Sequence, residues 1–381
     1  MFEAEEAILA ANGHDVGRLT VSNDAVADLS RVGLAKTTVW SRAGHDAVEA
    51  AARDHRADVV HFHNTLPLIS PAGYYGARAA GAAVVQTLHN FRLICPGALL
   101  YRDGEICEDC VGKAFAAPGV RHGCYRGNRA ATLAVAGMTA AHRVAGTWDR
   151  AVDRYVAITE FARGKFVAGG LPSDRIAVKA NPLSEDPGVG QHGGDFALFV
   201  GRLDEGKGLD IALRAWETCA ALPPLVIVGD GPQAPLVRDA VDRMGADRIR
   251  WKGWLQSPDV LSLMREARVS VFASELFEGG TPMTIVEALA SGLPIVATDR
   301  GAARQILHDG VEGVRFRPGD ARALAASVHE VLRDPDAYLA MCGAARATFE
   351  RTYAPGPNYA VLAHIYSEAL ATRYRDERSP Y

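Results

Sequence analysis

A glycine-containing loop with two basic residues stands out at residues 199–208, where the sequence is FVGRLDEGKG. The apolar start of this segment predicts a strand, and the apolar periodicity from Leu209 onward predicts a helix directly after the loop. Gly201 lets the backbone approach a ligand, the helix N-terminus offers free N–H groups, and Arg202 and Lys207 add two positive charges. These features suit a diphosphate. The alternative is an ordinary loop whose two basic side chains face solvent.

A second loop, followed by another predicted helix, carries two carboxylates. It spans residues 278–289 and follows an apolar strand, which puts it at the carboxyl edge of a parallel sheet, where α/β proteins bind ligands. Glu278 begins the loop, and Glu287 can accept hydrogen bonds from two ribose hydroxyls. The alternative is that Glu287 is an exposed helix carboxylate, which its apolar neighbours disfavour. The other residues expected to contact the ligand in this loop are Gly279, Gly280, Thr281, Pro282, Met283 and Thr284.

Two shorter loops are expected at the same edge. Gly229 and Gly231 follow the apolar run LVIV in a tight turn, and Gly253 and Trp254 follow the segment IRWK. Trp254 offers an aromatic face that suits a nucleobase, although plain packing explains a tryptophan equally well. Because four strands end in loops suited to a ligand, we predict a binding site at this edge.

Four of the six cysteines lie in one stretch, and their spacing suits a metal. Cys107 and Cys110 form a C-x-x-C pair, with Cys95 before it and Cys124 after it. Four thiolates satisfy a closed tetrahedral zinc site, which would stabilise a long segment without a core of its own. Free thiols fit equally well, because the chain has a single C-x-x-C pair. Disulfides are the less favoured alternative in a reducing cytoplasm.

Short β-branched runs alternate with helical patterns along the chain, which predicts parallel sheets covered by helices. In the first half, the expected strands are residues 18–21, 59–63, 83–88, 155–158 and 176–179. In the second half, they are residues 197–200, 225–228, 249–251, 269–272, 294–297 and 314–316. The pattern predicts an α/β protein with two Rossmann-like, doubly wound parallel-sheet domains.

Length and the distribution of Pro and Gly predict the domain boundaries. At 381 residues the chain is too long for one ordinary hydrophobic core, and a polar Pro- and Gly-rich linker begins at Asn181. We expect an N-terminal domain over residues 1–183 and a C-terminal domain over residues 184–354. We expect a final helix within residues 355–381 to cross back to the N-terminal domain.

The chain begins with an amphipathic helix at residues 2–11, where a doubly wound domain normally begins with a strand. We expect that this first strand and its glycine-rich loop are missing, because the start codon is assigned too late or the gene is truncated. A domain that truly begins with a helix is the alternative. The N-terminus lacks the basic segment and apolar run of a signal peptide.

Composition excludes some partners. A formal net charge of -4 argues against a general nucleic-acid-binding protein, which needs an excess of Lys and Arg on one face. The most apolar helical stretch, residues 130–141, is too short to span a bilayer. We therefore expect a cytoplasmic protein, and the composition leaves peripheral contact with the inner face of the membrane open.

The order of these motifs resembles that of the retaining glycosyltransferases with two Rossmann-like domains, the GT-B architecture, and in particular its family-four members. The resemblance spans almost the whole chain and is carried by GRLDEGKG, VGDGP, WKGW and EGGTPMTIVEALASGLPIVATDRGA. It implies a cleft between the domains, with the donor nucleotide on the C-terminal domain and the acceptor on the N-terminal domain. The implied activity is transfer of a hexose-type sugar from a nucleotide diphosphate to an acceptor hydroxyl, with retention of configuration.

The resemblance also implies roles for single residues. Arg202 and Lys207 match the family's diphosphate-binding pair, and Glu287 matches the carboxylate that holds the ribose. Glu278 matches a carboxylate near the donor sugar, although eight residues separate it from Glu287 where seven are usual. His89, in the sequence TLHN, resembles the family's histidine beside the transferred sugar; the alternative is a structural histidine at a strand end.

For catalysis, the resemblance implies no metal and no cofactor, because cations and helix N–H groups stabilise the departing diphosphate. A UDP-sugar is the preferred donor and a GDP-sugar the second. The acceptor is a glycan, a lipid-linked molecule or a small molecule, and residues 91–128 are expected to help to bind it. Two other functions fit the sequence: a non-catalytic nucleotide-sugar-binding protein that has lost its first strand, and an epimerase or hydrolase on the same scaffold.

Overall fold

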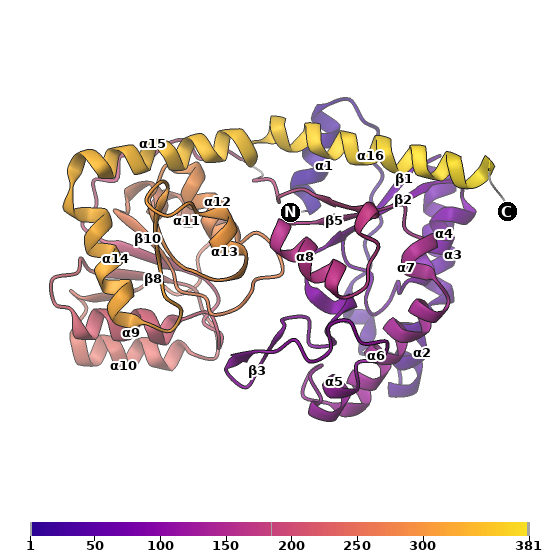
Figure 1. The fold of residues 1–381 in the computed structure, drawn as a ribbon, viewed down its shortest axis with the longest axis horizontal. Helices are drawn as coiled ribbons and strands as arrows, with labels where there is room; N and C mark the ends of the chain where they lie inside the picture. The colour runs from indigo at the N-terminus through magenta and orange to yellow at the C-terminus, as the bar shows by residue number, and fades with distance from the viewer. Residues whose placement is uncertain (1, 184, 379–381) are drawn as a thin grey trace. The chain divides into compact units, whose positions relative to one another are not determined.

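Two compact units make up the protein (Figure 1). The computed structural model describes residues 2–183 and 185–378. Asn181–Pro357 form the C-terminal unit, and Phe2–Ala180 together with the chain from Asn358 onward form the N-terminal unit. Each unit has a parallel sheet with flanking helices, so the predicted α/β fold with two Rossmann-like domains is confirmed.

The C-terminal unit contains a six-stranded parallel sheet in the order β12-β11-β10-β7-β8-β9. The strands β8 and β10 lie on either side of β7, so the strand order reverses next to the first strand of the unit. This is the doubly wound order, in which ligands bind at the carboxyl ends of the two strands at the reversal, here β7 and β10. The strands are β7 (Ala197–Val200), β8 (Leu225–Val228), β9 (Ile249–Trp251), β10 (Val269–Phe272), β11 (Ile295–Thr298) and β12 (Gly313–Phe316).

All six strands expected in this half are present, and their bounds agree with the predicted ones to within one residue. Every residue of β8 is buried, as a parallel strand covered on both faces requires. The helix α9 turns Leu209 and Trp216 into the same core, where both are buried. The helices are α9 (Leu209–Thr218), α10 (Ala234–Met244), α11 (Ser257–Glu266), α12 (Met283–Ala290), α13 (Gly301–Ile306), α14 (Ala321–Arg333) and α15 (Pro335–Thr352).

The N-terminal unit has a four-stranded parallel sheet in the order β1-β2-β5-β6. Its strands are β1 (Val59–Phe62), β2 (Ala83–Leu88), β5 (Arg154–Ala157) and β6 (Ile176–Val178). Its α-helices outside the cysteine-containing segment are α1 (Phe2–Ala11), α2 (Arg31–Val39), α3 (Arg42–Asp54), α4 (Ala72–Ala79), α6 (Arg129–Val144), α7 (Thr147–Arg150) and α8 (Glu160–Ala168). Short 3₁₀ helices are η1 (Asn23–Val26) and η3 (Ser173–Arg175).

The strand predicted at residues 18–21 is wrong, because this stretch has no regular structure. Leu19 and Val21 keep 40% and 44% of their surface exposed, so their apolar side chains do not contribute to a sheet. The side chain of Arg18 is instead held by Glu6 and Glu3 of α1. In the described part of the chain, the first strand of the N-terminal unit is β1.

A segment between β2 and α6 carries little regular structure. It contains η2 (Phe91–Leu93), an antiparallel pair formed by β3 (Tyr101–Arg102) and β4 (Glu105–Ile106), and α5 (Ala117–His122). The four clustered cysteines lie in this segment, half-buried and with free thiols.

The last helix, α16 (Pro355–Arg378), packs from Asn358 onward on the N-terminal unit. Its Ile365 and Ala369 are buried against Ala83 and Val85 of β2 and against β5. In Figure 1 it is the yellow helix that runs past β1 and β2. Among the helices that the structure describes, none combines the length and apolar character needed to cross a membrane.

Candidate active site

The loops after β7 and β10 meet at the strand-order reversal of the C-terminal unit. Gly208, the N-cap of α9, has a φ of 75°, and a Cβ atom placed on it would lie 1.9 Å from the carbonyl oxygen of Ala273. Only glycine permits both this backbone conformation and this approach. The start of α9 is thereby held against the chain that leaves β10. No side chain caps α9, so its first N–H groups are available to an anion.

Lys207 and Glu278 connect the two loops. Lys207 Nζ lies 2.8 Å from Oε1 and 3.0 Å from Oε2 of Glu278, and Ser274 Oγ donates a 2.6 Å hydrogen bond to Oε1. Glu278 has a φ of 50°, a conformation rare for a residue other than glycine, and its partners hold it there. The structure therefore brings two of the predicted catalytic residues together at the carboxyl ends of β7 and β10.

Arg202 lies on the same loop as Lys207 but is much more exposed. Its side chain keeps 81% of its surface exposed and pairs with Asp204 Oδ2 at 2.5 Å. An exposed ion pair of this kind contributes little to stability. Arg202 thus retains the freedom to turn to a ligand at the end of β7.

Glu287 lies on α12, which follows the β10 loop. Burial raises the pKa of the Glu287 carboxyl above its ordinary value, and no described residue pairs with this carboxylate. The start of α12 after Pro282 has no side-chain cap, so its N–H groups are also open to a ligand. Of the remaining loop residues, Thr281 is buried, and Gly279, Gly280, Met283 and Thr284 are half-buried.

The loops after β8 and β9 support the β7 loop. Gly229 has a φ of 137°, and a Cβ atom on it would lie 1.8 Å from the carbonyl oxygen of Gly201; one on Gly231 would lie 2.7 Å from the Leu203 oxygen. The Gly229 N–H donates to the oxygen of Gly253 at 2.8 Å. These glycines therefore set the shape of the β7 loop. Trp254 is 70% exposed on the loop after β9.

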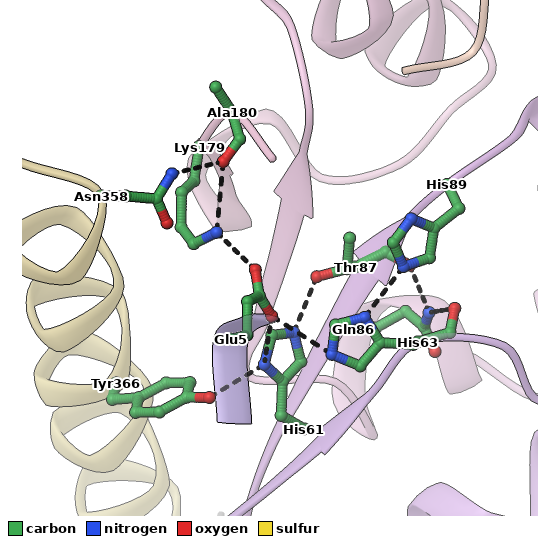
Figure 2. Close-up of polar contacts among 10 residues, drawn as sticks. All are labelled: Glu5, His61, His63, Gln86, Thr87, His89, Lys179, Ala180, Asn358 and Tyr366. Atoms are coloured by element: carbon green, nitrogen blue, oxygen red, sulfur yellow. Dashed lines mark hydrogen bonds and ion pairs between the residues drawn. The ribbon is translucent and has the colours of Figure 1, made fainter. Parts of the chain in front are cut away.

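In the N-terminal unit, His89 follows β2 and contacts a second histidine. His89 Nε2 lies 2.9 Å from Nδ1 of His63, and the two rings stack with their centroids 5.1 Å apart. Burial, followed by the charge of His63, lowers the pKa of His89 to about 4, so His89 is neutral at neutral pH. Figure 2 shows this pair beside a group of polar side chains from α1, β1, β2 and the end of β6.

A buried ion pair forms the centre of that group. Lys179, 3% exposed, is paired with Oε1 of Glu5, which is 4% exposed. Glu5 Oε2 lies 3.2 Å from His63 Nε2 and 3.8 Å from His61 Nδ1. Burial alone would raise the pKa of Glu5, but the contacts with His63 and Lys179 hold it well below its ordinary value. Glu5 is therefore a carboxylate at neutral pH.

His61 lies beside this carboxylate and is held by two hydroxyls. Its Nδ1 is 2.9 Å from the Tyr366 hydroxyl of α16, and its Nε2 is 2.7 Å from Thr87 Oγ1. Burial, followed by the charge of His63, lowers the pKa of His61 to about 3. The ring therefore stays neutral.

Sequence reasoning missed Glu5, His61, His63 and Lys179. One signal was available: the segment HFH puts His61 and His63 on the same face of a strand, two residues apart. The contributions of Glu5 and Lys179 come from elements distant in the chain, so no local pattern indicates them.

Two groups in the described residues have three candidate metal ligands within 4.8 Å of one another: Glu5, His61 and His63, and the more exposed His45, Asp46 and Glu49. In the first group, Lys179 already neutralises Glu5, and the nitrogens of His61 are hydrogen-bonded to hydroxyls. Oε2 of Glu5, the oxygen that faces His61 and His63, accepts no hydrogen bond within the described residues. The sulfur atoms of Cys95, Cys107, Cys110 and Cys124 do not form such a group within the described residues, and zinc binding by them stays a prediction.

The match to a known protein family lies in the C-terminal unit. Residues 195–334 match the family model described as Glycosyl transferases group 1. The chain is 30% identical over 197 residues to a phosphatidyl-myo-inositol mannosyltransferase of Mycobacterium leprae, covering 49% of this chain and 52% of that one. It is 29% identical over 187 residues to glycogen synthase of Mycobacterium tuberculosis, covering 48% of this chain and 44% of that one. The matches thus span about half the length of these relatives.

Solved structures extend the similarity to both units. Sucrose-phosphate synthase from Thermosynechococcus elongatus superposes with a TM-score of 0.66 at 15% identity, over 96% of this chain and 91% of that one. Anabaena HepE in complex with UDP-glucose gives a TM-score of 0.62 at 17% identity, over 96% of this chain and 89% of that one. The predicted GT-B fold is therefore confirmed, and the predicted resemblance to glycosyltransferases is confirmed for residues 195–334.

Proposed function

We propose that this chain of GT-B fold, with its group 1 glycosyltransferase segment, transfers a hexose-type sugar from a nucleotide diphosphate to an acceptor hydroxyl. One observation supports the proposal above all. The glycine loop that carries Lys207 and the loop that carries Glu278 meet at the reversal of strand order, where doubly wound sheets bind nucleotides. Uncapped N-termini of α9 and α12 follow these same two loops.

The chemistry that these residues support is stabilisation of a departing diphosphate. When the bond between the sugar and the phosphate breaks, negative charge grows on the phosphate oxygens. The Lys207 ammonium, the Arg202 guanidinium and the N–H groups at the start of α9 can take up that charge without a metal ion. Glu278 orients Lys207 in the loop, and the carboxylate of Glu287 is suited to the hydroxyls of the ribose.

Retention of configuration is part of the proposal and rests on the family resemblance. In that reaction the acceptor attacks on the face that the leaving group vacates, and the departing phosphate helps to take the acceptor proton. His89 is proposed to contact the transferred sugar. As a neutral histidine, it offers one N–H donor and one acceptor nitrogen.

A UDP-sugar is the donor to test first, with a GDP-sugar second, because HepE, which has a similar fold, was crystallised with UDP-glucose. A lipid-linked acceptor deserves the same priority, since one relative is named a phosphatidyl-myo-inositol mannosyltransferase. Peripheral contact with the inner face of a membrane would bring such an acceptor to the protein.

The first test is a thermal-shift screen with nucleotide sugars, followed by assays of transfer and of donor hydrolysis. A ligand at a hundred times its Kd stabilises the folded state by about 2.7 kcal/mol. In Lys207→Ala, the loss of a charged hydrogen bond worth about 1.5 to 3 kcal/mol should lower kcat/KM by about 10- to 150-fold. Removing Arg202 as well should lower it on the order of a thousandfold or more.

Arg243→Ala is the matched control. Arg243 lies in the last turn of α10, at the opposite end of the helix from the β8 loop, and pairs with Glu217 at 3.3 Å. Its removal should leave activity unchanged. Binding without transfer or hydrolysis would indicate a non-catalytic nucleotide-sugar-binding protein, and conversion of the donor sugar without an acceptor would indicate an epimerase. Absence of a shift with every donor would refute the proposal.

A further inference from the structure

Three side chains that can bind a metal ion meet where α1 lies beside β1. Glu5 of α1, His61 of β1 and His63 directly after β1 each offer one ligand atom, and these three atoms lie within 4.8 Å of one another. Figure 2 shows both histidine rings beside the carboxylate, and the centroids of the two rings are 4.5 Å apart. Two histidines and one glutamate form a ligand set that proteins use for zinc.

The spacing of the three atoms suits a tetrahedral ion. Zinc binds histidine nitrogen at about 2.0 to 2.1 Å and carboxylate oxygen at about 2.0 to 2.2 Å, so two of its ligands lie about 3.3 to 3.5 Å apart. Oε2 of Glu5 is 3.2 Å from Nε2 of His63 and 3.8 Å from Nδ1 of His61. The two observed distances fall on either side of the ideal one, so small movements of the side chains would accommodate the ion.

The carboxylate oxygen between the two rings lacks a hydrogen bond. Glu5 is 4% exposed, and its Oε2 accepts no hydrogen bond within the described residues. Nε2 of His63 is near enough to donate one, so the two atoms are close without being aligned for a hydrogen bond. A buried polar atom without a partner is costly. An ion bound by Oε2 and the two ring nitrogens would remove that cost.

The second nitrogen of each histidine already has a partner. Nε2 of His61 lies 2.7 Å from Oγ1 of Thr87, and Nδ1 of His63 lies 2.9 Å from Nε2 of His89. Histidines that bind metals are held in the same way, because the outer partner fixes the orientation of the ring. The Phe2 ring packs edge-on against His63, with the centroids 5.3 Å apart, and adds an apolar wall to the group.

We propose that Glu5, His61 and His63 form a zinc site that fastens α1 to β1. The ligand atoms are Oε2 of Glu5, Nδ1 of His61 and Nε2 of His63, and a water completes the tetrahedron. Because the ligands come from segments far apart in the chain, binding of the ion adds directly to the stability of the N-terminal unit. The site is separate from the cysteines, and the proposed transfer reaction assigns no step to the ion.

Two groups compete with the ion. Lys179 pairs with Oε1 of Glu5 and places a positive charge near the ion. The Tyr366 hydroxyl lies 2.9 Å from Nδ1 of His61, so it must give up this contact when the ion binds. Removal of Lys179 should therefore strengthen metal binding, and Tyr366→Phe should not weaken it. Without a metal site, loss of Lys179 would only leave the buried Glu5 carboxylate unpaired.

The direct test is a titration of the metal-free full chain with Co²⁺, followed by absorbance and by competition with Zn²⁺. The wild-type chain should bind one ion without the sulfur-to-metal charge-transfer bands that cysteine thiolates produce. His61→Phe and His63→Phe should each weaken this binding by more than about 100-fold, because each removes a ligand. Thr87→Val removes only an outer partner of His61, so it should weaken binding by about 10- to 100-fold.

His45→Ala is the matched control, because His45 belongs to the more exposed candidate group with Asp46 and Glu49. This variant should keep the wild-type affinity. Lys179→Met should bind Zn²⁺ about tenfold or more tightly, and Zn²⁺ should raise its Tm by more than it raises that of the wild-type chain. If Lys179→Met is unfolded without metal, Zn²⁺ should restore its folding.

The zinc site is overturned if the wild-type chain binds Co²⁺ only with the bands of thiolate ligands. It is equally overturned if His61→Phe and His63→Phe keep the wild-type affinity, or if Zn²⁺ neither raises the Tm of Lys179→Met nor restores its folding. None of these measurements uses sugar transfer. A chain that turns over no nucleotide sugar can therefore still confirm the zinc site, and an active enzyme can still refute it.

Discussion

Gly208→Ala should damage both the stability and the ligand binding of the C-terminal unit. An L-residue in the left-handed conformation that Gly208 adopts, φ of 75°, costs about 1 to 2 kcal/mol. The new Cβ would also lie 1.9 Å from the oxygen of Ala273, a backbone atom, so the loop or the start of α9 must shift. Overpacking of this kind costs about 1 to 3 kcal/mol more. We therefore expect a total loss of about 2 to 5 kcal/mol in the free energy of unfolding.

Gly310→Ala separates the two contributions. Gly310 lies between α13 and β12 with a φ of 77°, close to that of Gly208, but a Cβ on it meets nothing within 4 Å. Its substitution should cost only the backbone term, about 1 to 2 kcal/mol, and should leave nucleotide binding intact. Urea denaturation gives the two free energies, and calorimetry gives the Kd of UDP. Equal destabilisation by the two variants, or an unchanged Kd in Gly208→Ala, would refute the argument that close packing of the two loops builds the site.

Three further predictions concern single residues. Burial raises the pKa of Glu287 above 4.5, and a protonated carboxyl accepts hydrogen bonds from ribose hydroxyls poorly. Nucleotide affinity should therefore fall as the pH decreases through that raised pKa. Glu287→Gln should bind the nucleotide more weakly, and a titration of its Kd against pH should lack this step. Trp251→Phe removes the 3.0 Å hydrogen bond from Nε1 to the Gly229 oxygen and should lower stability by about 0.5 to 1.5 kcal/mol in urea denaturation; no change would mean that this bond does not hold the β8 loop. The purified chain should contain stoichiometric zinc that Cys107→Ser reduces, as measured by elemental analysis; a metal-free protein whose Tm does not respond to chelators would leave free thiols as the correct interpretation.

Most strands of the C-terminal unit were predictable because they are short, mostly apolar runs that are largely buried. In β8, four consecutive apolar residues are all buried, and turn-forming glycines follow them directly. The strand predicted at residues 18–21 does not form. Its alternating local pattern does not reveal whether a neighbouring strand exists to pair with it. Arg18 is held by carboxylates of α1, and the apolar residues that follow it stay exposed.

The candidate site was predictable where backbone geometry builds it. Gly208 and Gly229 mark loops that need a positive φ, and both are visible as glycines directly after apolar runs or before a helix. Pairing between side chains that are distant in the sequence could not be predicted. Neither Glu5 nor Lys179 carries a local signal, and only the packing of α1 against the end of β6 brings them together. The Lys207–Glu278 pair is intermediate, because both residues were predicted and their direct contact was not.

The polar groups at the sheet edge are mainly backbone groups in the C-terminal unit and mainly side chains in the N-terminal unit. The two units should therefore respond differently to substitutions. In the C-terminal unit, the order of strands reverses, so two loops and two uncapped helix N-termini converge, and the proposed anion site consists largely of backbone. In the N-terminal unit, the four described strands follow one another in sequential order, and histidine side chains at β1 and β2 carry the polar groups. A backbone site is sensitive to added Cβ atoms and insensitive to pH near neutrality. The histidine site is sensitive to changes in hydrogen-bond partners, so substitutions in the two units should separate phosphate binding from the handling of the sugar.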